Sequence, residues 1–175
     1  MKLRHIVVFV AVVALLGFAL PCAQAERISR TSTLTIPSGG GTATMVESVK
    51  IVGIGTGSKE AGIHTLGITW NSSSAGNVTA TIPAIDGVLM RVTFDPSASA
   101  APSASYDIVV NDVDSFDVLR GAGANLSATV TTSPGIFATD ASYGYPMPIN
   151  GALTLAVTNA GNAKTGLIRL YIRRE

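Results

Sequence analysis

Apolar and polar residues alternate along most of this 175-residue chain, with the period of a β-strand that buries one face. The clearest alternating runs are residues 63–70, 87–95, 106–110, 153–158 and 168–173. No segment after residue 25 has the period of an amphipathic helix. The pattern predicts an all-β protein: a single β-sandwich, or jelly-roll-like domain, of about 8–10 short antiparallel strands in residues 26–175.

Other stretches fit the same architecture. Less regular strands are predicted at residues 27–36, 43–54, 77–82 and 126–132. The low-complexity segment 96–105, PSASAAPSAS, is predicted to be an exposed connection. Loops are predicted at residues 121–125 and 140–148, because Gly, Asn, Ser and Pro interrupt the alternation there.

The most regular alternation lies close to the C-terminus, in residues 152–173. Two alternating runs flank a short Asn- and Gly-containing segment, which is the arrangement of a β-hairpin. The side chains predicted to face the core there are Leu153, Leu155, Val157, Ile168, Leu170 and Ile172. In residues 87–95, one face is predicted to carry Val88, Met90, Val92 and Phe94 and the other face Leu89, Arg91 and Thr93.

The first 25 residues have a different pattern. Lys2 and Arg4 precede an unbroken apolar run at residues 6–20, and an Ala-Gln-Ala triplet follows at residues 23–25. This is the layout of a secretory signal peptide, so we expect cleavage after Ala25 and an exported protein: periplasmic, cell-surface or extracellular. A retained anchor is the alternative, but the run is shorter than the about 20 apolar residues of a spanning helix. After cleavage we expect no stable membrane span.

Composition narrows the set of partners. Without residues 1–25 the chain keeps ten of its twelve Lys and Arg and all eleven Asp and Glu, which is a net charge of about −1. Such a balance gives no basic face for nucleic acid.

The one cysteine, Cys22, lies before the cleavage site, and Pro21 stands where a lipoprotein needs a small residue. Removal with the signal peptide is therefore favoured over lipidation, and the exported domain has no disulfide or Cys-based metal site.

The sequence offers little catalytic chemistry. His64 is the only histidine after residue 25, and alternation places it on the same apolar face of its strand as Trp70. A structural role is therefore favoured over that of a general base. Residues 53–59, GIGTGSK, lack the Gly-Lys-Ser/Thr of a P-loop, and residues 121–123, GAG, lack the rest of a dinucleotide fingerprint. We expect no enzymatic activity and no cofactor.

Two clusters are the candidates for binding. Asp112, Asp114 and Asp117 are alternating carboxylates of the kind that ligate calcium. An acidic turn is favoured over a calcium site, because the loop glycine and terminal glutamate of an EF-type loop are missing. Tyr143 and Tyr145 are the best pair for an aromatic platform that binds a surface glycan.

Four stretches share their order and composition with a known group of proteins. They are residues 68–70 with 76–78 (ITW and GNV), 82–95 (IPAIDGVLMRVTFD), 106–125 (YDIVVNDVDSFDVLRGAGAN) and 150–172 (NGALTLAVTNAGNAKTGLIRLYI). Together they resemble small virion or structural proteins of tailed phages and prophages. The resemblance implies a β-rich, non-enzymatic component of a particle or appendage and transfers no binding residue. Tailed-phage particles assemble in the cytoplasm, so an export signal indicates either a phage-like domain with an extracellular or envelope role or an unusual start codon.

The expected function is that of a non-enzymatic structural subunit. It is either a decoration or appendage component of a virion or an exported surface or adhesive protein. Low charge and many Ala, Thr and Ser on outward strand faces favour self-association into a homo-oligomer, a particle or a surface lattice. The alternative is a secreted carbohydrate-binding module or a glycan-active β-sandwich protein, since exported sandwiches serve both purposes.

Overall fold

The structure is a computed structural model that describes residues 27–35, 40–51, 62–140 and 143–174. These residues contain ten strands and no helix, which confirms the all-β prediction. The strands are β1 (Arg27–Thr33), β2 (Thr42–Ile51), β3 (Gly62–Asn71), β4 (Val78–Ile82), β5 (Gly87–Pro96), β6 (Asp107–Asn111), β7 (Phe137–Asp140), β8 (Tyr143–Ile149), β9 (Leu153–Thr158) and β10 (Thr165–Arg174). The predicted signal peptide and the glycine-rich segment 53–59 lie outside the described residues.

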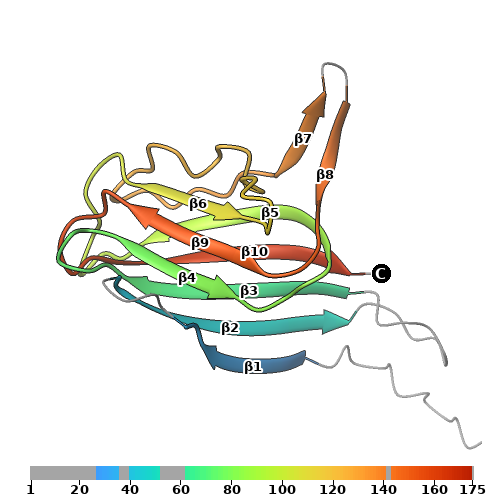
Figure 1. Cartoon of the computed structure of the whole chain (residues 1–175), viewed down its shortest axis with the longest axis horizontal. Helices are drawn as coiled ribbons and strands as arrows, with labels where there is room; N and C mark the ends of the chain where they lie inside the picture. Colours follow the sequence, from blue (N-terminus) through green and yellow to red (C-terminus); the bar gives the residue numbers. More distant parts are fainter. Residues whose placement is uncertain (1–26, 36–39, 52–61, 141–142, 175) are drawn as a thin grey trace, which may run out of the picture.

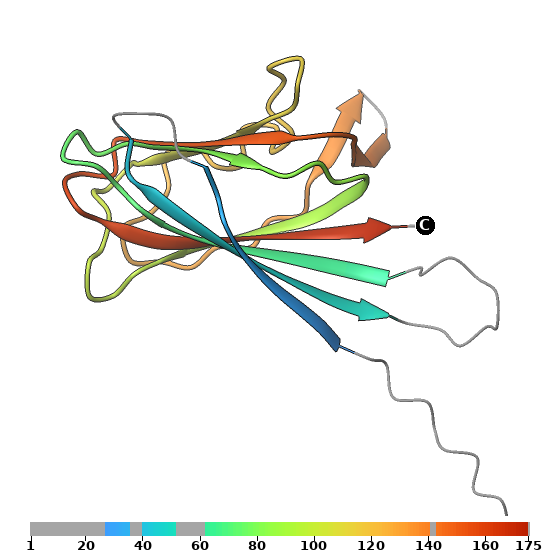
Figure 2. The ribbon, with the colours of Figure 1, turned by 60° about the horizontal axis from the view of Figure 1, so that its bottom comes forward.

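The strands form two antiparallel sheets that pack face to face (Figures 1 and 2). The larger sheet has the order β1-β2-β3-β10-β5-β8-β7 and the smaller sheet the order β4-β9-β6. From β3 to β6 the chain alternates between the sheets. Later, β9 enters between β4 and β6, and β10 enters between β3 and β5. This is the connectivity of a jelly roll, with β1 and β2 added at one edge of the larger sheet.

Each sheet turns one face towards a common core. Alternation along β3 buries Leu66, Ile68 and Trp70 together with His64, so the predicted face of this histidine is confirmed. The six aliphatic residues predicted for the C-terminal strands are each at most 1% exposed. Trp70 of the larger sheet lies against Tyr106, which precedes β6, with ring centroids 5.8 Å apart. Contacts of this kind between the sheets make one continuous core.

The predicted C-terminal hairpin is wrong. β9 pairs with β4 and β6 in the smaller sheet, whereas β10 pairs with β3 and β5 in the larger sheet. The connecting residues turn the chain from one sheet to the other through positive φ angles at Asn159 (61°), Gly161 (86°) and Ala163 (51°). Alternation identified the buried faces correctly but not the neighbouring strands, because it carries no information about which strand lies alongside.

The predicted faces of β5 are wrong in its first half. Leu89 is fully buried, whereas Val88 and Met90 are only partly buried. The pairing of β5 with β10 contains an irregularity that leaves one extra residue on β5 between Leu89 and Arg91. An extra residue shifts the alternation by one position. Leu89 therefore shares the core face with Val92.

One predicted strand and one predicted loop also differ from the structure. Residues 126–132 are not a regular strand, and within the described chain Leu126 and Thr132 form isolated bridges. Residues 140–148, predicted as a loop, belong mostly to β8, which pairs with β7 and with the start of β5. Both ladders of β8 are short, so Pro146 and Pro148, which have no N–H to donate, are tolerated there.

Alkaline pH is expected to destabilise the fold through Tyr106. Burial, and secondarily the negative charge of Asp95, raises the pKa of Tyr106 from 10.0 to about 12. The folded state disfavours the phenolate, so this contribution to stability is intact below pH 10 and is lost as the pH rises towards 12. A pKa shift of this size corresponds to about 2–3 kcal/mol at most. Urea unfolding gives the free energy of unfolding at about pH 9 and at about pH 11. Between these two pH values, this free energy should decrease less for Tyr106→Phe than for the parent. Equal losses would contradict the assignment.

Candidate functional site

Two segments without regular strand structure extend the sheets at one side of the sandwich. Residues 117–126 follow β6 in the smaller sheet. They form backbone hydrogen bonds to this strand, and in one of these the Val118 N–H donates to the Val110 carbonyl oxygen at 2.8 Å. Residues 132–136 follow β5 in the larger sheet through backbone hydrogen bonds and bridges. A pocket between these segments therefore has walls from both sheets.

The three aspartates considered as calcium ligands lie in the turn that leads into the first segment. Asp112 Oδ1 accepts two backbone N–H groups of the same turn, at 2.9 and 3.0 Å, one of them from Asp114. Asp117 accepts the Leu119 N–H at 3.0 Å on Oδ1 and the Gly121 N–H at 2.8 Å on Oδ2. In the described residues, no three His, Cys, Asp or Glu side chains gather in a way that would hold a metal ion. Asp112 and Asp117 thus accept backbone N–H groups that hold this acidic turn.

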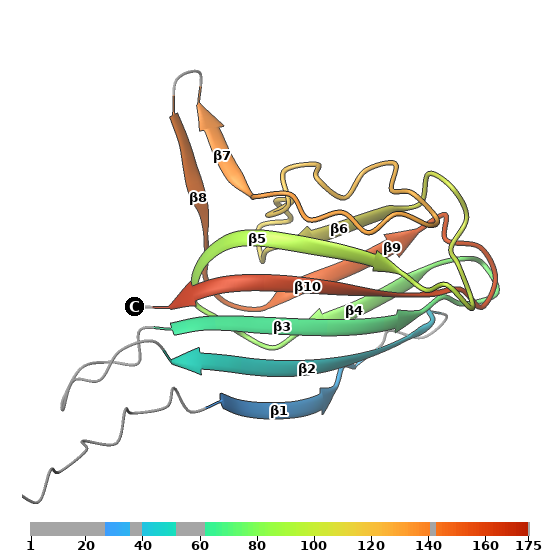
Figure 3. The same ribbon diagram turned by 180° about the vertical axis from the view of Figure 1, so that it is seen from behind.

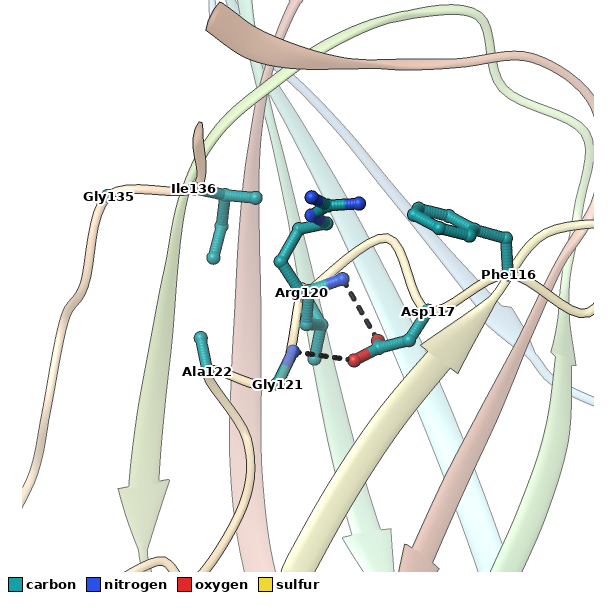
Figure 4. A pocket seen from close by; sticks show the side chains of 8 residues that line it. Phe116, Asp117, Arg120, Gly121, Ala122, Gly135 and Ile136 are labelled. Atoms are coloured by element: carbon teal, nitrogen blue, oxygen red, sulfur yellow. Dashed lines mark hydrogen bonds between the residues drawn. The ribbon is translucent and has the colours of Figure 1, made fainter. Parts of the chain in front are cut away.

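A pocket of about 570 Å³ opens beside this turn (Figure 4). The side chains that line it come from Phe116, Asp117, Leu119, Arg120, Ala122 and Ile136. Leu119 and Ile136 are buried and supply apolar walls, whereas Phe116 is 41% exposed. Figure 4 shows the guanidinium of Arg120 between the Phe116 ring and Ile136.

Arg120 is the cation of this pocket. Its Cζ lies 5.2 Å from the centroid of the Phe116 ring, which is a cation–π contact. The neighbouring Asp117 carboxylate is occupied by backbone N–H groups, and no carboxylate of the described residues forms an ion pair with Arg120. The guanidinium therefore has unused hydrogen-bond donors that face the pocket.

The backbone of Arg120 is strained. Its φ angle is +56°, in the left-handed region. This conformation costs a residue other than glycine roughly 1–2 kcal/mol. Arg120 is the one charged residue among the described non-glycine residues with positive φ. Strained residues of this kind are concentrated at functional sites, so the strain marks Arg120 as a candidate binding residue.

His64 belongs to a different region, on β3 beside β2. Its Nδ1 lies 3.1 Å from Glu47 Oε1, and the two side chains are 7% and 21% exposed. A second pocket, of about 200 Å³, lies next to Glu47 and is lined by residues such as Met45, Ile85 and Arg174. No Ser, Thr, Cys or Tyr is among the described residues that line it. His64 is not among the described residues that line this pocket, and Glu47 is its side-chain partner in the described structure.

β7 and β8 form an arm that leaves the body of the sandwich (Figures 1 and 3). The two strands pair with each other as far as Asp140 and Tyr143. β8 joins the larger sheet through residues 147–149, which pair with the start of β5. The glycan-platform candidates Tyr143 and Tyr145 are therefore strand positions on this arm and do not lie in a loop.

The arm interrupts a strand of the larger sheet. Residues 132–136 and 147–149 run along the same edge of β5, one after the other, with Gly135 opposite Arg91 and Met147 opposite Leu89. The excursion between them is the arm. Because both segments at its base pair with β5, a shorter arm would still leave this edge of β5 covered.

No protein-family model matches the chain, and no match is found among curated proteins. In the part of the chain that the structure describes, no helix has the length and hydropathy of a membrane span. Inference about function therefore depends on the geometry of the arm and of the pocket.

The sequence pattern singled out neither Phe116 nor Arg120. They meet Ile136 in space because segments about twenty residues apart extend different sheets at the same side of the sandwich. One signal was present in the sequence: Arg120 is an isolated cation that directly precedes Gly121 in a segment with few charges. That signal suggests an exposed arginine at a turn and says nothing of a pocket.

Proposed function

We propose that this protein is a non-enzymatic structural subunit that self-associates through the β7–β8 arm. The observation that carries the proposal is the projection of the arm, in which β7 pairs with β8 alone among the described strands (Figure 1). A two-stranded hairpin is only marginally stable by itself in water. Packing of the arm against a second copy of the chain would provide the missing support, and symmetric pairing of copies is the usual route to oligomers.

The composition of the arm supports an interface. Residues 137–149 read FATDASYGYPMPI and contain one charged residue, Asp140, with one Phe, two Tyr and one Met. Interface cores are depleted in charge and enriched in aromatic residues and Met. The opposite edge of the larger sheet ends at β1, and an edge strand can pair with another chain. Two separate contact edges suit an extended assembly such as a particle or a surface lattice.

Shortening the arm is expected to reduce the oligomeric state without unfolding the protein. Phe137 pairs with Pro146, so replacing residues 138–145 with Asn-Gly leaves a tight two-residue hairpin turn at the base. The protein produced from the full chain should elute as a dimer or larger oligomer in size-exclusion chromatography with light scattering. The shortened variant should elute as a monomer and keep a cooperative thermal melt, because both segments at the base of the arm still pair with β5.

Val130→Ser provides the matched control, since Val130 is an exposed apolar residue, 56% exposed, that does not belong to the arm. This variant should keep the oligomeric state of the parent. A parent that is monomeric at every concentration from about 1 to 100 μM would refute self-association in solution. A shortened variant that stays oligomeric would show that the interface lies outside the arm.

A further inference from the structure

We infer that the pocket beside Arg120 binds a small organic carboxylate with a ring-sized body. This inference goes beyond the proposed structural role and does not depend on it. It rests on three features that meet in the pocket: an arginine without an ion-pair partner, an exposed aromatic ring and buried aliphatic walls. Each feature selects for a different property of the ligand.

The charge of the ligand follows from Arg120. A guanidinium presents a planar fork of N–H donors that matches the two oxygens of a carboxylate. The one acid of the lining, Asp117, accepts the backbone N–H groups of Leu119 and Gly121 on its two carboxylate oxygens. Asp117 forms no ion pair with the Arg120 guanidinium. Among the described residues that line the pocket, Arg120 is the one cation and Asp117 the one anion. A ligand with a single carboxylate, placed at the guanidinium, matches this lining better than a ligand with several negative charges, which Asp117 would repel.

The size of the ligand follows from the volume and the walls. About 570 Å³ is much more than a bare inorganic anion occupies. An anion bound alone to Arg120 would also leave the apolar surfaces of Phe116, Leu119 and Ile136 in contact with water. Binding pockets usually combine such apolar walls with a few polar groups that orient the ligand. A ring attached to the carboxylate would cover the apolar walls, and either an aromatic ring or the C–H face of a sugar ring has suitable chemistry.

The position of the pocket also favours a ligand. It is open to solvent beside the turn of residues 112–121, and this turn is held by the carboxylates of Asp112 and Asp117. The left-handed φ angle of Arg120 is fixed within the same turn, because the Arg120 N–H donates to the Asp117 carbonyl oxygen at 3.1 Å. The guanidinium is thus presented by an ordered turn, which lowers the conformational cost of binding.

The test is a titration of the ¹⁵N-labelled full chain with benzoate and with glucuronate, followed by two-dimensional NMR. One charge pair and one ring contact should give a dissociation constant on the order of 1 mM. Saturable shifts are expected for amides of residues 116–122 and 135–136, and not for the neutral analogues benzamide and glucose. A response to benzoate alone identifies an aromatic acid as the ligand class, and a response to glucuronate alone identifies an acidic sugar. No saturable shift with either acid at ten times the expected dissociation constant would overturn the inference.

Substitution of Arg120 links the response to the pocket. Arg120→Gln should weaken binding about tenfold or more, and Arg120→Lys, which keeps the charge but not the fork, should weaken it less. The matched control is Arg91→Gln. Arg91 is also exposed and stacked on an aromatic ring, with its Cζ 4.1 Å from the Tyr171 centroid, but it does not line the pocket. Binding by Arg120→Gln equal to that of the parent, or an equal loss in the Arg91 variant, would overturn the assignment to Arg120.

Discussion

A chain that ends at Lys164 is expected to lose cooperative folding, because the deletion removes β10 from the middle of the larger sheet. β10 pairs with β3 along one edge, from Thr165 opposite Asn71 to Arg174 opposite Gly62, and with β5 along the other. Its loss would split the seven-stranded sheet and expose two strand edges. It would also remove Ile168, Leu170 and Ile172 from the core, and each large aliphatic side chain contributes roughly 1.5–3 kcal/mol. The whole domain is stabilised by only about 5–15 kcal/mol.

Circular dichroism during thermal unfolding is the measurement. The deleted chain should show no cooperative transition, whereas a control chain that ends at Arg173 should melt close to the parent, since it keeps most of both ladders. A cooperative melt of the deleted chain near the temperature of the parent would mean that β10 is dispensable and that its aliphatic side chains do not belong to the core.

The role of β10 shows what the sequence could and could not predict. Strict alternation in residues 168–172 revealed a strand with one buried face, and the structure buries that face completely. The same alternation suggested pairing with residues 153–157 because they are the nearest strand along the chain. The actual neighbours are β3, about a hundred residues away in the sequence, and β5, about eighty residues away. Their selection depends on how the two sheets close around a common core, which local periodicity does not encode.

Smaller deviations from the prediction have local causes. The extra residue near Met90 reverses the alternation of β5, and nothing in the sequence of that strand marks it. Prolines at 146 and 148 suggested a loop, but they are accommodated where the ladders of β8 are short. The pocket could not be predicted for a third reason: Arg120 and Ile136 come together only through the edges of different sheets. In each case the missing information concerns tertiary contacts between segments that are distant in the sequence.

Leu170→Ala is expected to destabilise the protein by about 2–5 kcal/mol, from the lost burial and from the cavity that remains. Leu170 is fully buried on the central strand, opposite Leu66 of β3 and Val92 of β5. Surrounded on both sides by strands, the site has little freedom to collapse. The adjacent Arg169→Ala is the matched control: its Nη1 lies 3.3 Å from Asp95 Oδ2, and both side chains are 36% exposed. An exposed ion pair contributes about 0–1 kcal/mol. Urea unfolding should therefore show a large decrease in midpoint for Leu170→Ala and a small one for Arg169→Ala, and similar decreases for the two variants would contradict the inward orientation of Leu170.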